Sequence, residues 1–300
     1  MAADTTLDAD QILADANVLL AEEIAGLDAL EIEPGGDASR LRAFWSATWP
    51  KVAAVGLALL FWQLVVWSHW KPEYILPGPN KVVPALWEKT KSGVLPRAVA
   101  TTMRRAVTGF AIAVLVGCAI GLVVSTFKLA RVAFGSLITG LQTMPSVAWF
   151  PLALVLFKQS EAAIFFVIML GAAPSIANGL LTGVDNIPPI LTRAGRVLGA
   201  GRLAQIRHVV LPGALPSFVS GLRQGWAFAW RSLLAGELIV IIANKPSIGS
   251  RLDFDRQFND YPSMMATMLV ILLIGVVIDS LVFTQLDRAI LRRRGLAPAR

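Results

Sequence analysis

Apolar runs of membrane-spanning length constrain this chain more than any other feature. A helix needs about 20 predominantly apolar residues to cross the hydrocarbon core, because lipid cannot satisfy backbone N–H and C=O groups. Six segments meet this requirement: 52–69, 106–126, 134–157, 162–183, 217–242 and 264–286. The sequence therefore predicts an all-α membrane protein with six transmembrane helices and no sizeable soluble domain.

The charged residues are distributed unevenly. The first 39 residues hold ten of the 20 acidic residues and no Lys or Arg, so the remainder carries 27 − 10 = +17. We predict that residues 1–43 form an acidic cytoplasmic N-terminal extension. It is either a solvated tail or a docking helix for a cytoplasmic partner, and the tail is favoured because acidic segments with few aromatic residues are usually disordered.

Loop charge predicts the orientation in the membrane. The segment 128–131 and the loop 184–212 sum to +2 and +3 and the C-terminus is strongly basic, whereas residues 158–161 and 243–263 sum to zero. Basic loops tend to stay in the cytoplasm, so both termini are predicted there, in a multi-pass protein of the cell (inner) membrane. The connector 68–105, at about +5, disagrees with this rule.

The predicted organisation follows from these segments. Residues 44–96 comprise the first transmembrane helix and an extracytoplasmic connector, in which VVPALWEKT is expected to lie along the membrane surface as a helix. Residues 97–290 form a core of five transmembrane helices with a cytoplasmic loop at 186–213, and residues 291–300 form a basic cytoplasmic tail.

No catalytic or cofactor-binding pattern is present. The sequence lacks a G-x-x-x-x-G-K-[ST] phosphate loop, and its only histidines, His69 and His208, have no neighbouring ligands. Its single cysteine, Cys118, lies within an apolar run, and no nucleophile–base pair is recognisable. We therefore predict no catalytic residue, metal or cofactor and no nucleic-acid partner. Uphill transport would need energy from a partner protein or an ion.

One basic, glycine-punctuated stretch, RAGRVLGAGRLAQIRHVVLPGALP at 193–216, separates two apolar runs. Its pattern predicts a helix from Ile190 to about Leu203, a bend and a second amphipathic run at 204–210. Pro212 and Pro216 are expected to break the chain before the next span. The alternative is an ordinary re-entry loop whose arginines serve only the topology.

The spacing of this stretch resembles the EAA loop of bacterial ABC importer permeases. Ala194 fills the first Ala position and Gly199 the Gly position, and Val209 followed by Leu211-Pro212 closes the match. Two positions differ, with Arg193 at the Glu position and Gly195 at the second Ala position. The resemblance implies a helix that docks on an ATPase subunit, with these coupling residues: Arg193, Ala194, Gly195, Val197, Leu198, Gly199, Ala200, Arg202, Leu203, Leu211 and Pro212.

The resemblance extends over roughly residues 70–295. LPGPNKVVPALWE, TTMRRAVTGFAIAVLVGCAIGL, MPSVAWFPLALVLF and GLRQGWAFAWRSLLAGELI resemble successive regions of the nitrate/sulfonate/taurine/bicarbonate permeases. It implies a type I permease fold, two ABC ATPase subunits that hydrolyse the ATP, a second permease copy in a homodimer and an extracytoplasmic substrate-binding protein. The implied substrate is a small anion, with aliphatic sulfonate or taurine slightly ahead of nitrate or bicarbonate.

Polar residues within the predicted spans are candidates for the translocation pathway: Arg231, Glu237, Gln142 and Trp149. Arg231 either adds positive potential to an anion pathway or joins a helix–helix hydrogen-bond network, and the network is favoured. Six residues advance a helix by about 600°, so Arg231 and Glu237 are expected on different faces. Arg223 and Asp279 also lie at membrane depth, and the sequence indicates no partner for Asp279.

An ion-coupled secondary transporter or channel that works without an ATPase is the competing class. Such a protein would show paired intramembrane carboxylates or inverted repeats. Glu237 and Asp279 are the only deep acids in the predicted spans, and no matching half is recognisable.

Overall fold

The computed structural model describes residues 37–293, which form helices joined by short connections and contain no strand. The chain divides into two units, Met1–Ser68 and His69–Arg300. Within the first unit, helix α2 (Asp37–Trp67) contains the predicted first span and begins inside the predicted extension. The rest of that extension, including the suggested docking helix, lies outside the described residues.

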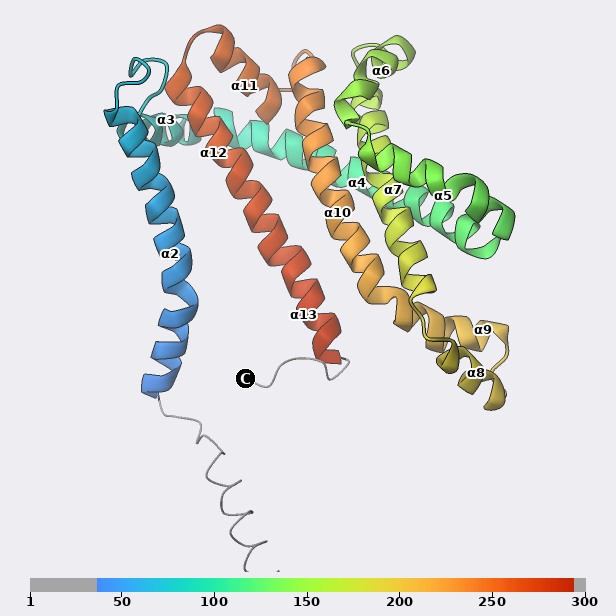
Figure 1. The fold of residues 1–300 in the computed structure, drawn as a ribbon. Helices are drawn as coiled ribbons and strands as arrows, with labels where there is room; N and C mark the ends of the chain where they lie inside the picture. The colour runs from blue at the N-terminus through green and yellow to red at the C-terminus, as the bar shows by residue number, and fades with distance from the viewer. Residues whose placement is uncertain (1–36, 294–300) are drawn as a thin grey trace, which may run out of the picture. The chain divides into compact units, whose positions relative to one another are not determined.

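The second unit is built from a succession of helices (Figure 1). In chain order these are α3 (Pro79–Lys91), α4 (Val94–Thr126), α5 (Lys128–Thr143), η1 (Ser146–Trp149), α6 (Phe150–Phe157), α7 (Glu161–Asp185), α8 (Pro189–Val197), α9 (Arg202–Gln205), η2 (Ile206–Val210), α10 (Leu211–Ile239), α11 (Ile248–Gln257), α12 (Tyr261–Ile278), η3 (Asp279–Phe283) and α13 (Thr284–Arg293). The segment VVPALWEKT is helical as predicted and lies within α3, which buries Val82 and packs on α12; its position along the membrane surface stays a prediction.

Four continuous helices among the described residues are long and apolar enough to cross a membrane: Trp49–Trp67, Val94–Thr126, Glu161–Asp185 and Tyr261–Arg292. They contain four of the six predicted spans. The second span begins well before the predicted residue 106, because the helix of α4 continues through the basic residues that precede the apolar run. The count of six apolar spans is therefore not confirmed, and the remaining two predicted spans differ for separate reasons.

The predicted span 134–157 is not one straight helix. Helices Leu129–Thr143 and Ser146–Phe157 pass the apolar test together but are bent by 103° at the break between them. Pro145 causes this break, since a residue before proline is driven out of the helical region and Met144 has φ −77° and ψ 128°. The segment is a broken span or a re-entrant pair of helices.

The predicted span 217–242 lies in α10, which is long enough at 29 residues but is not among the apolar spans. Its sequence includes Arg223, Gln224, Arg231 and Glu237 as well as several glycines and serines. These residues lower the hydropathy of a helix that contacts α7, α4 and α11. The polar groups of α10 therefore need protein or water around them rather than lipid.

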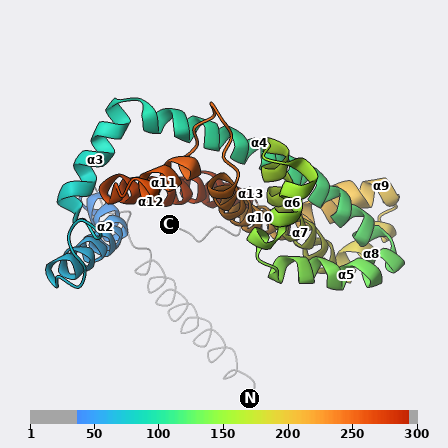
Figure 2. The same ribbon diagram turned by 90° about the horizontal axis from the view of Figure 1, so that it is seen from above.

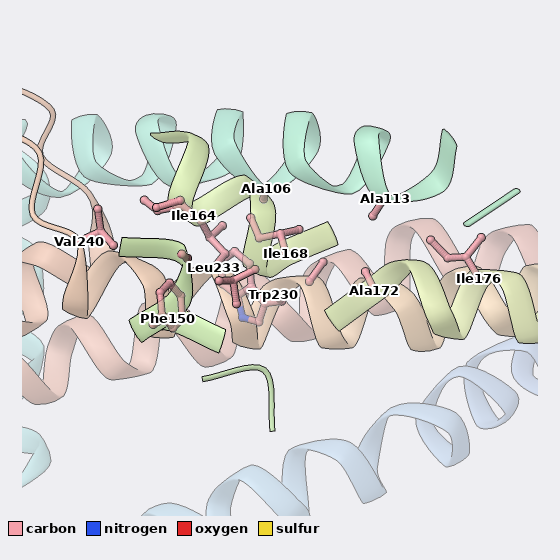
Figure 3. Close-up of a cluster of buried hydrophobic side chains, with 14 residues drawn as sticks. Ala106, Ala113, Phe150, Ile164, Ile168, Ala172, Ile176, Trp230, Leu233 and Val240 are labelled. Carbon is pink, nitrogen blue, oxygen red and sulfur yellow. The ribbon is translucent and has the colours of Figure 1, made fainter. Parts of the chain in front are cut away.

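The hydrophobic core lies where α4, α6, α7 and α10 meet. Figure 3 shows Ala106 from α4, Phe150 from α6, Ile164 and Ile168 from α7 and Leu233 from α10 gathered in one cluster. Each of these side chains is at most 2% exposed. Helix α4 packs along α7 over several turns, from Gly109 against Ile168 to Gly121 against Ala177, and it also contacts α10 (Figures 1 and 2).

Small residues allow these helices to approach closely. A Cβ atom built on Gly179 of α7 would lie 2.6 Å from the Cα of Gly221 of α10, and one built on Gly221 would lie 2.7 Å from the Cα of Gly179. On α4, a Cβ on Gly117 would lie 2.7 Å from the carbonyl oxygen of Ala173. Small residues let helix backbones touch within membranes, where apolar side chains gain nothing over lipid.

Replacing Gly221 with Ala is expected to destabilise the protein by about 1–3 kcal/mol, because its new methyl group would meet backbone atoms that cannot move aside. Gly140→Ala is the matched control, since Gly140 is also helical and has no atom within 4 Å of a built Cβ. Thermal denaturation in detergent should lower the transition temperature of Gly221→Ala alone. Equal transitions for the two variants would contradict the close contact of α7 with α10.

Candidate functional site

The stretch that the sequence singled out forms a helical hairpin between α7 and α10. Helix α8 ends at Val197, so the predicted continuation to Leu203 is wrong. Gly199 ends the helix with φ +79°: its N–H donates to Arg196 O at 3.0 Å and the N–H of Ala200 donates to Gly195 O at 2.9 Å. This pair of hydrogen bonds is the Schellman motif, whose left-handed residue is usually glycine. The Gly of the sequence motif is therefore the residue that turns the chain.

The return arm of the hairpin is helical from Arg202 onward. A Cβ built on Gly195 would lie 3.7 Å from both Gln205 Cγ and Val209 Cγ2, which places α8 against α9 and η2. The predicted breaks at Pro212 and Pro216 are wrong, because α10 runs through both. Pro212 falls in the first turn of α10, directly after the π-helical turn η2, so the helix departs from regular α-helical bonding just before the residue that lacks an N–H.

The hairpin is anchored to the long helices at its base. A Cβ on Gly213 would lie 3.1 Å from Ile187 Cγ1, and one on Gly183 of α7 would lie 2.6 Å from the carbonyl oxygen of Ala214. The end of α7 therefore touches the beginning of α10 directly beneath the hairpin. Leu211, at this junction, is 61% exposed. The base of the hairpin thus lies where α7 and α10 meet.

The tip of the hairpin exposes apolar and basic side chains together. Val197, Leu198 and Leu203 are 88%, 86% and 83% exposed, and the neighbouring arginines are exposed as well: Arg193, Arg196 and Arg202. Gly199, Gly201 and Ala194 add little side-chain volume to this surface. Exposed apolar groups rimmed by charge are typical of a protein interface. The structure thus brings the sequence-predicted coupling residues onto one small surface, apart from Leu211 and Pro212 at its base.

A buried ionic network lies at the other end of α7 and α10. Arg105 of α4 is 2% exposed, and its Nη1 donates to Glu237 Oε1 of α10 at 3.1 Å. Its Nε and Nη2 both donate to Glu161 Oε1 at the start of α7, each at 3.3 Å. A third donor to Glu161 is Lys245 Nζ, at 3.2 Å. One guanidinium thus ties α4 to α7 and α10.

The network continues into α11. Thr102 Oγ1 donates to Glu237 at 2.8 Å and accepts the N–H of Ile248 at 2.9 Å, while the N–H of Gly249 donates to Glu237 Oε2 at 3.1 Å. The first backbone groups of α11 are therefore satisfied by α4 and α10. A buried charge is tolerated only with such complete pairing, so this end of the bundle behaves as one unit.

Sequence reasoning missed most of this network. It assigned Arg105 to a connector, whereas the residue lies inside α4. The available signal was the spacing of Thr102 and Arg105, which places both on one helix face, but nothing in the sequence pointed to Glu161 as their partner.

The four pathway candidates do not converge on one place. Glu237 is fully buried and bonded within the network, so it and Arg231 lie apart, as the helical spacing predicted. Trp149 packs against the core cluster, and the Nε2 of Gln142 is buried without a hydrogen-bond partner. Arg231 lines a cavity together with Arg223 and Asp279. Asp279 has a partner after all, since Arg223 Nε and Nη2 donate to its two oxygens at 2.7 and 2.6 Å.

The described part of the chain thus combines apolar helices of membrane-spanning length, a bundle of close-packed helices and an exposed helical hairpin. Residues 109–292 match the family described as binding-protein-dependent transport system inner membrane component, well over half of the chain. The chain belongs to this family and is an ABC importer permease subunit, a multi-pass membrane protein.

Individual relatives agree with this assignment. The chain is 28% identical over 233 residues to a putative ABC transporter permease protein of Methanocaldococcus jannaschii, covering 76% of this chain and 86% of the relative. It is 30% identical over 191 residues to a bicarbonate transport system permease protein of Synechococcus elongatus (64% and 68% covered). It is 27% identical over 201 residues to a nitrate import permease protein of the same species (63% and 71% covered).

Solved structures show the same fold. The MetNI methionine ABC transporter in an inward-facing conformation superposes with a TM-score of 0.54 at 19% identity, covering 65% of this chain and 94% of that one. An amino acid ABC transporter gives a TM-score of 0.52 at 18% identity, with 71% and 96% covered. These structures confirm the predicted type I ABC importer permease fold.

Replacing Gly199 with Ala is expected to destabilise the hairpin by about 1–2 kcal/mol, because the left-handed conformation strains a residue with a Cβ. Gly195→Ala is the matched control. Gly195 is helical, its Cβ would make ordinary contacts, and the change restores the Ala of the family motif. Hydrogen–deuterium exchange at the amides of Gly199 and Ala200 should accelerate only in Gly199→Ala. Faster exchange in Gly195→Ala alone would contradict this assignment of the turn.

Removing one partner of the buried network is expected to lower the free energy of unfolding substantially. Arg105→Met leaves the buried Glu237 without its cationic partner, so we expect a loss of about 3–5 kcal/mol, with much of it recovered in the double variant Arg105→Met/Glu237→Met. Arg104→Met is the control. Its side chain is 66% exposed and 3.7 Å from Glu161, so the change should cost at most about 1 kcal/mol. Thermal denaturation in detergent measures the wild type, the single variant Glu237→Met and these three variants, and a loss in the double variant equal to the sum of the two single losses would exclude the pairing.

Proposed function

We propose that this permease subunit imports a small anion, driven by ATP hydrolysis on partner ATPase subunits that dock at the hairpin tip. The observation that carries the proposal is the exposure of Val197, Leu198 and Leu203 beside three arginines. Exposed apolar groups of this kind have little reason to remain in water unless a partner covers them. The family of the chain is one of binding-protein-dependent transport systems, which supports a partner-driven role.

The proposed assembly follows the family architecture. Two ATPase subunits would bind two copies of this chain, and an extracytoplasmic binding protein would deliver the substrate. The hairpin, both termini and the acidic extension would lie in the cytoplasm, and the start of α11 would lie on the opposite side. The chain itself would hydrolyse no ATP, since its sequence has no phosphate loop.

The proposed mechanism uses the hairpin as a lever. Closure of the ATPase subunits would push the tip, and the Schellman turn would keep α8 and the return arm in a fixed geometry. Because the base of the hairpin contacts both α7 and α10, the push would shift these helices together relative to α12. Alternating access would follow as a two-state equilibrium that ATP and the loaded binding protein bias in turn.

The proposed substrate class rests on the relatives. Two of them are named for bicarbonate and nitrate transport, and both substrates are small oxyanions. The motif resemblance of the sequence adds aliphatic sulfonates to this class. A small anion with planar or tetrahedral oxygens is the shared chemistry.

Leu198→Asp is expected to abolish copurification of the ATPase, because it places a charge at the centre of the proposed apolar contact while leaving the turn intact. This change is sharper than one at Gly199, since any side chain there also strains the turn. The intact chain and the variant are purified from native membranes in mild detergent after cross-linking, and copurifying proteins are identified by mass spectrometry.

Phe258→Asp is the matched control, because Phe258 is also apolar and 68% exposed but follows α11, far from the hairpin in the fold (Figure 1). It should retain the ATPase. Absence of an ATPase from the cross-linked intact chain would overturn the proposal and favour an ion-coupled transporter. Equal retention by Leu198→Asp and Phe258→Asp would show that docking occurs elsewhere.

A further inference from the structure

The exposed face of α10 is polar over its middle turns, unlike the exposed face of α4. Exposed residues about one helical turn apart form a stripe on the middle of α10: Ser220, then Arg223 and Gln224, then Ala227 and Arg231. On α4 the exposed positions include Val107, Leu115 and Leu122, which suit lipid. Two arginines on one exposed stripe are too costly in hydrocarbon, so this stripe faces water or a polar cavity.

A groove lies along this stripe, between α10 and the helix formed by α12 and η3. One cavity of about 500 Å³ is lined by Arg231, Arg223, Asp279 and the rings of Trp226 and Trp230. A neighbouring cavity of about 570 Å³ shares Arg231, Trp230 and Asp279 with it. The volume is in the range of small-molecule sites, and its walls combine apolar rings with a few polar groups, as such sites do.

The two arginines of the groove differ in their charge balance. Arg223 forms a two-pronged ion pair with Asp279, and its Nη1 is also 3.4 Å from Asp287 Oδ2. Arg231 donates its Nε–H to the carbonyl oxygen of Ala227 at 3.0 Å and lies 4.8 Å over the ring of Phe228. No carboxylate in the described part of the chain pairs with it. Asp279 therefore neutralises one arginine, and Arg231 remains the unmatched cation.

The wall beside Arg231 is aromatic and rigid. The rings of Trp226 and Trp230 stack at a centroid distance of 6.4 Å and an interplanar angle of 16°, and Phe110 meets Trp226 edge-on at 5.2 Å. Figure 3 shows Trp230 within the core cluster, so its position is fixed by packing. A ligand in the groove would thus meet a guanidinium and a preorganised apolar surface together.

We propose that Arg231 is the anion-binding residue of this groove, and that Asp279 limits the groove to one unpaired positive charge. The ligand is a small organic anion whose charged end pairs with the Arg231 guanidinium and whose apolar part lies against Trp226 and Trp230. Guanidinium groups bind oxyanions through charge-assisted hydrogen bonds, and aromatic rings favour apolar contact over hydrated inorganic ions. A single unpaired charge binds the anion but keeps the affinity low enough for the anion to leave the groove. The inference rests on the proposed transport function and deepens it.

The test labels one cysteine in the groove. In a Cys118→Ser background, Ala227→Cys places a thiol one helical turn from Arg231, and the full-length chain in its native membrane is treated with sulfonatoethyl (anionic) or trimethylammonioethyl (cationic) methanethiosulfonate. We expect both reagents to react, with the anionic one favoured on the order of tenfold by the nearby charge. Leu115→Cys, on the apolar face of α4, should stay unlabelled.

Three variants of the Ala227→Cys protein separate charge from structure. Arg231→Gln should abolish the preference for the anionic reagent, Arg231→Lys should keep it, and Asp279→Asn should increase it by exposing the charge of Arg223. Butanesulfonate should also slow labelling at lower concentrations than nitrate does. An unlabelled Ala227→Cys, or a preference unchanged by Arg231→Gln, would overturn the site.

Two further results bear on the charge limit and on the ligand. A preference unchanged by Asp279→Asn would overturn the role of Asp279, and equal or absent protection by butanesulfonate would overturn the ligand class. None of these measurements involves the ATPase. They therefore fail independently of the docking experiment at Leu198.

Discussion

Facing glycines bring α7 and α10 into backbone contact, and the other features of the bundle are arranged around this contact. Gly179 and Gly221 lie so close that neither can carry a side chain, and the same packing continues from Gly183 against Ala214 and from Gly225 against Ile176. Helix packing in a membrane gains little from hydrophobicity, so contact area at short range supplies the stability. The two antiparallel helices consequently form one body, which for the 25 residues of α7 extends about 37 Å.

The hairpin and the buried ionic network lie at opposite ends of this body. At one end the chain leaves α7, forms the hairpin around Gly199 and enters α10. At the other end Glu161 of α7 and Glu237 of α10 converge on Arg105. In the proposed mechanism, the specific contacts at both ends would transmit a push on the hairpin to the ionic network and to α11. This is the physical requirement for a lever in alternating access.

Helix α10 contacts three different surroundings along its length. Its glycines face α7, Glu237 enters the buried network, and Arg223 and Arg231 lie on an exposed polar stripe. No single hydropathy value describes such a helix, which explains why it fails an apolar test that four other segments pass. The departure from a simple apolar span is therefore itself a sign of function, because polar groups at membrane depth need a structural or aqueous partner.

The amino-acid sequence was sufficient to define the class of fold and the position of the hairpin, whereas the pairing of polar groups required the packed bundle. Apolar length requires helices in a membrane, and the spacing from Ala194 through Gly199 to Leu211-Pro212 located the hairpin. Such features depend on local physical chemistry. Gly199 adopts a positive φ and Pro145 breaks a predicted span, and each acts only on its immediate neighbours.

In contrast, Arg105 and Glu237 are 132 residues apart, and Arg223 and Asp279 are 56 residues apart. Helical periodicity places each residue on a face but does not say which other helix lies opposite that face. The sequence therefore left Asp279 without a partner and grouped Glu237 with Arg231, although one is enclosed by α4 and α11 and the other is exposed in a groove. Pairing between distant helices depends on how their backbones pack, and that is a property of the whole bundle.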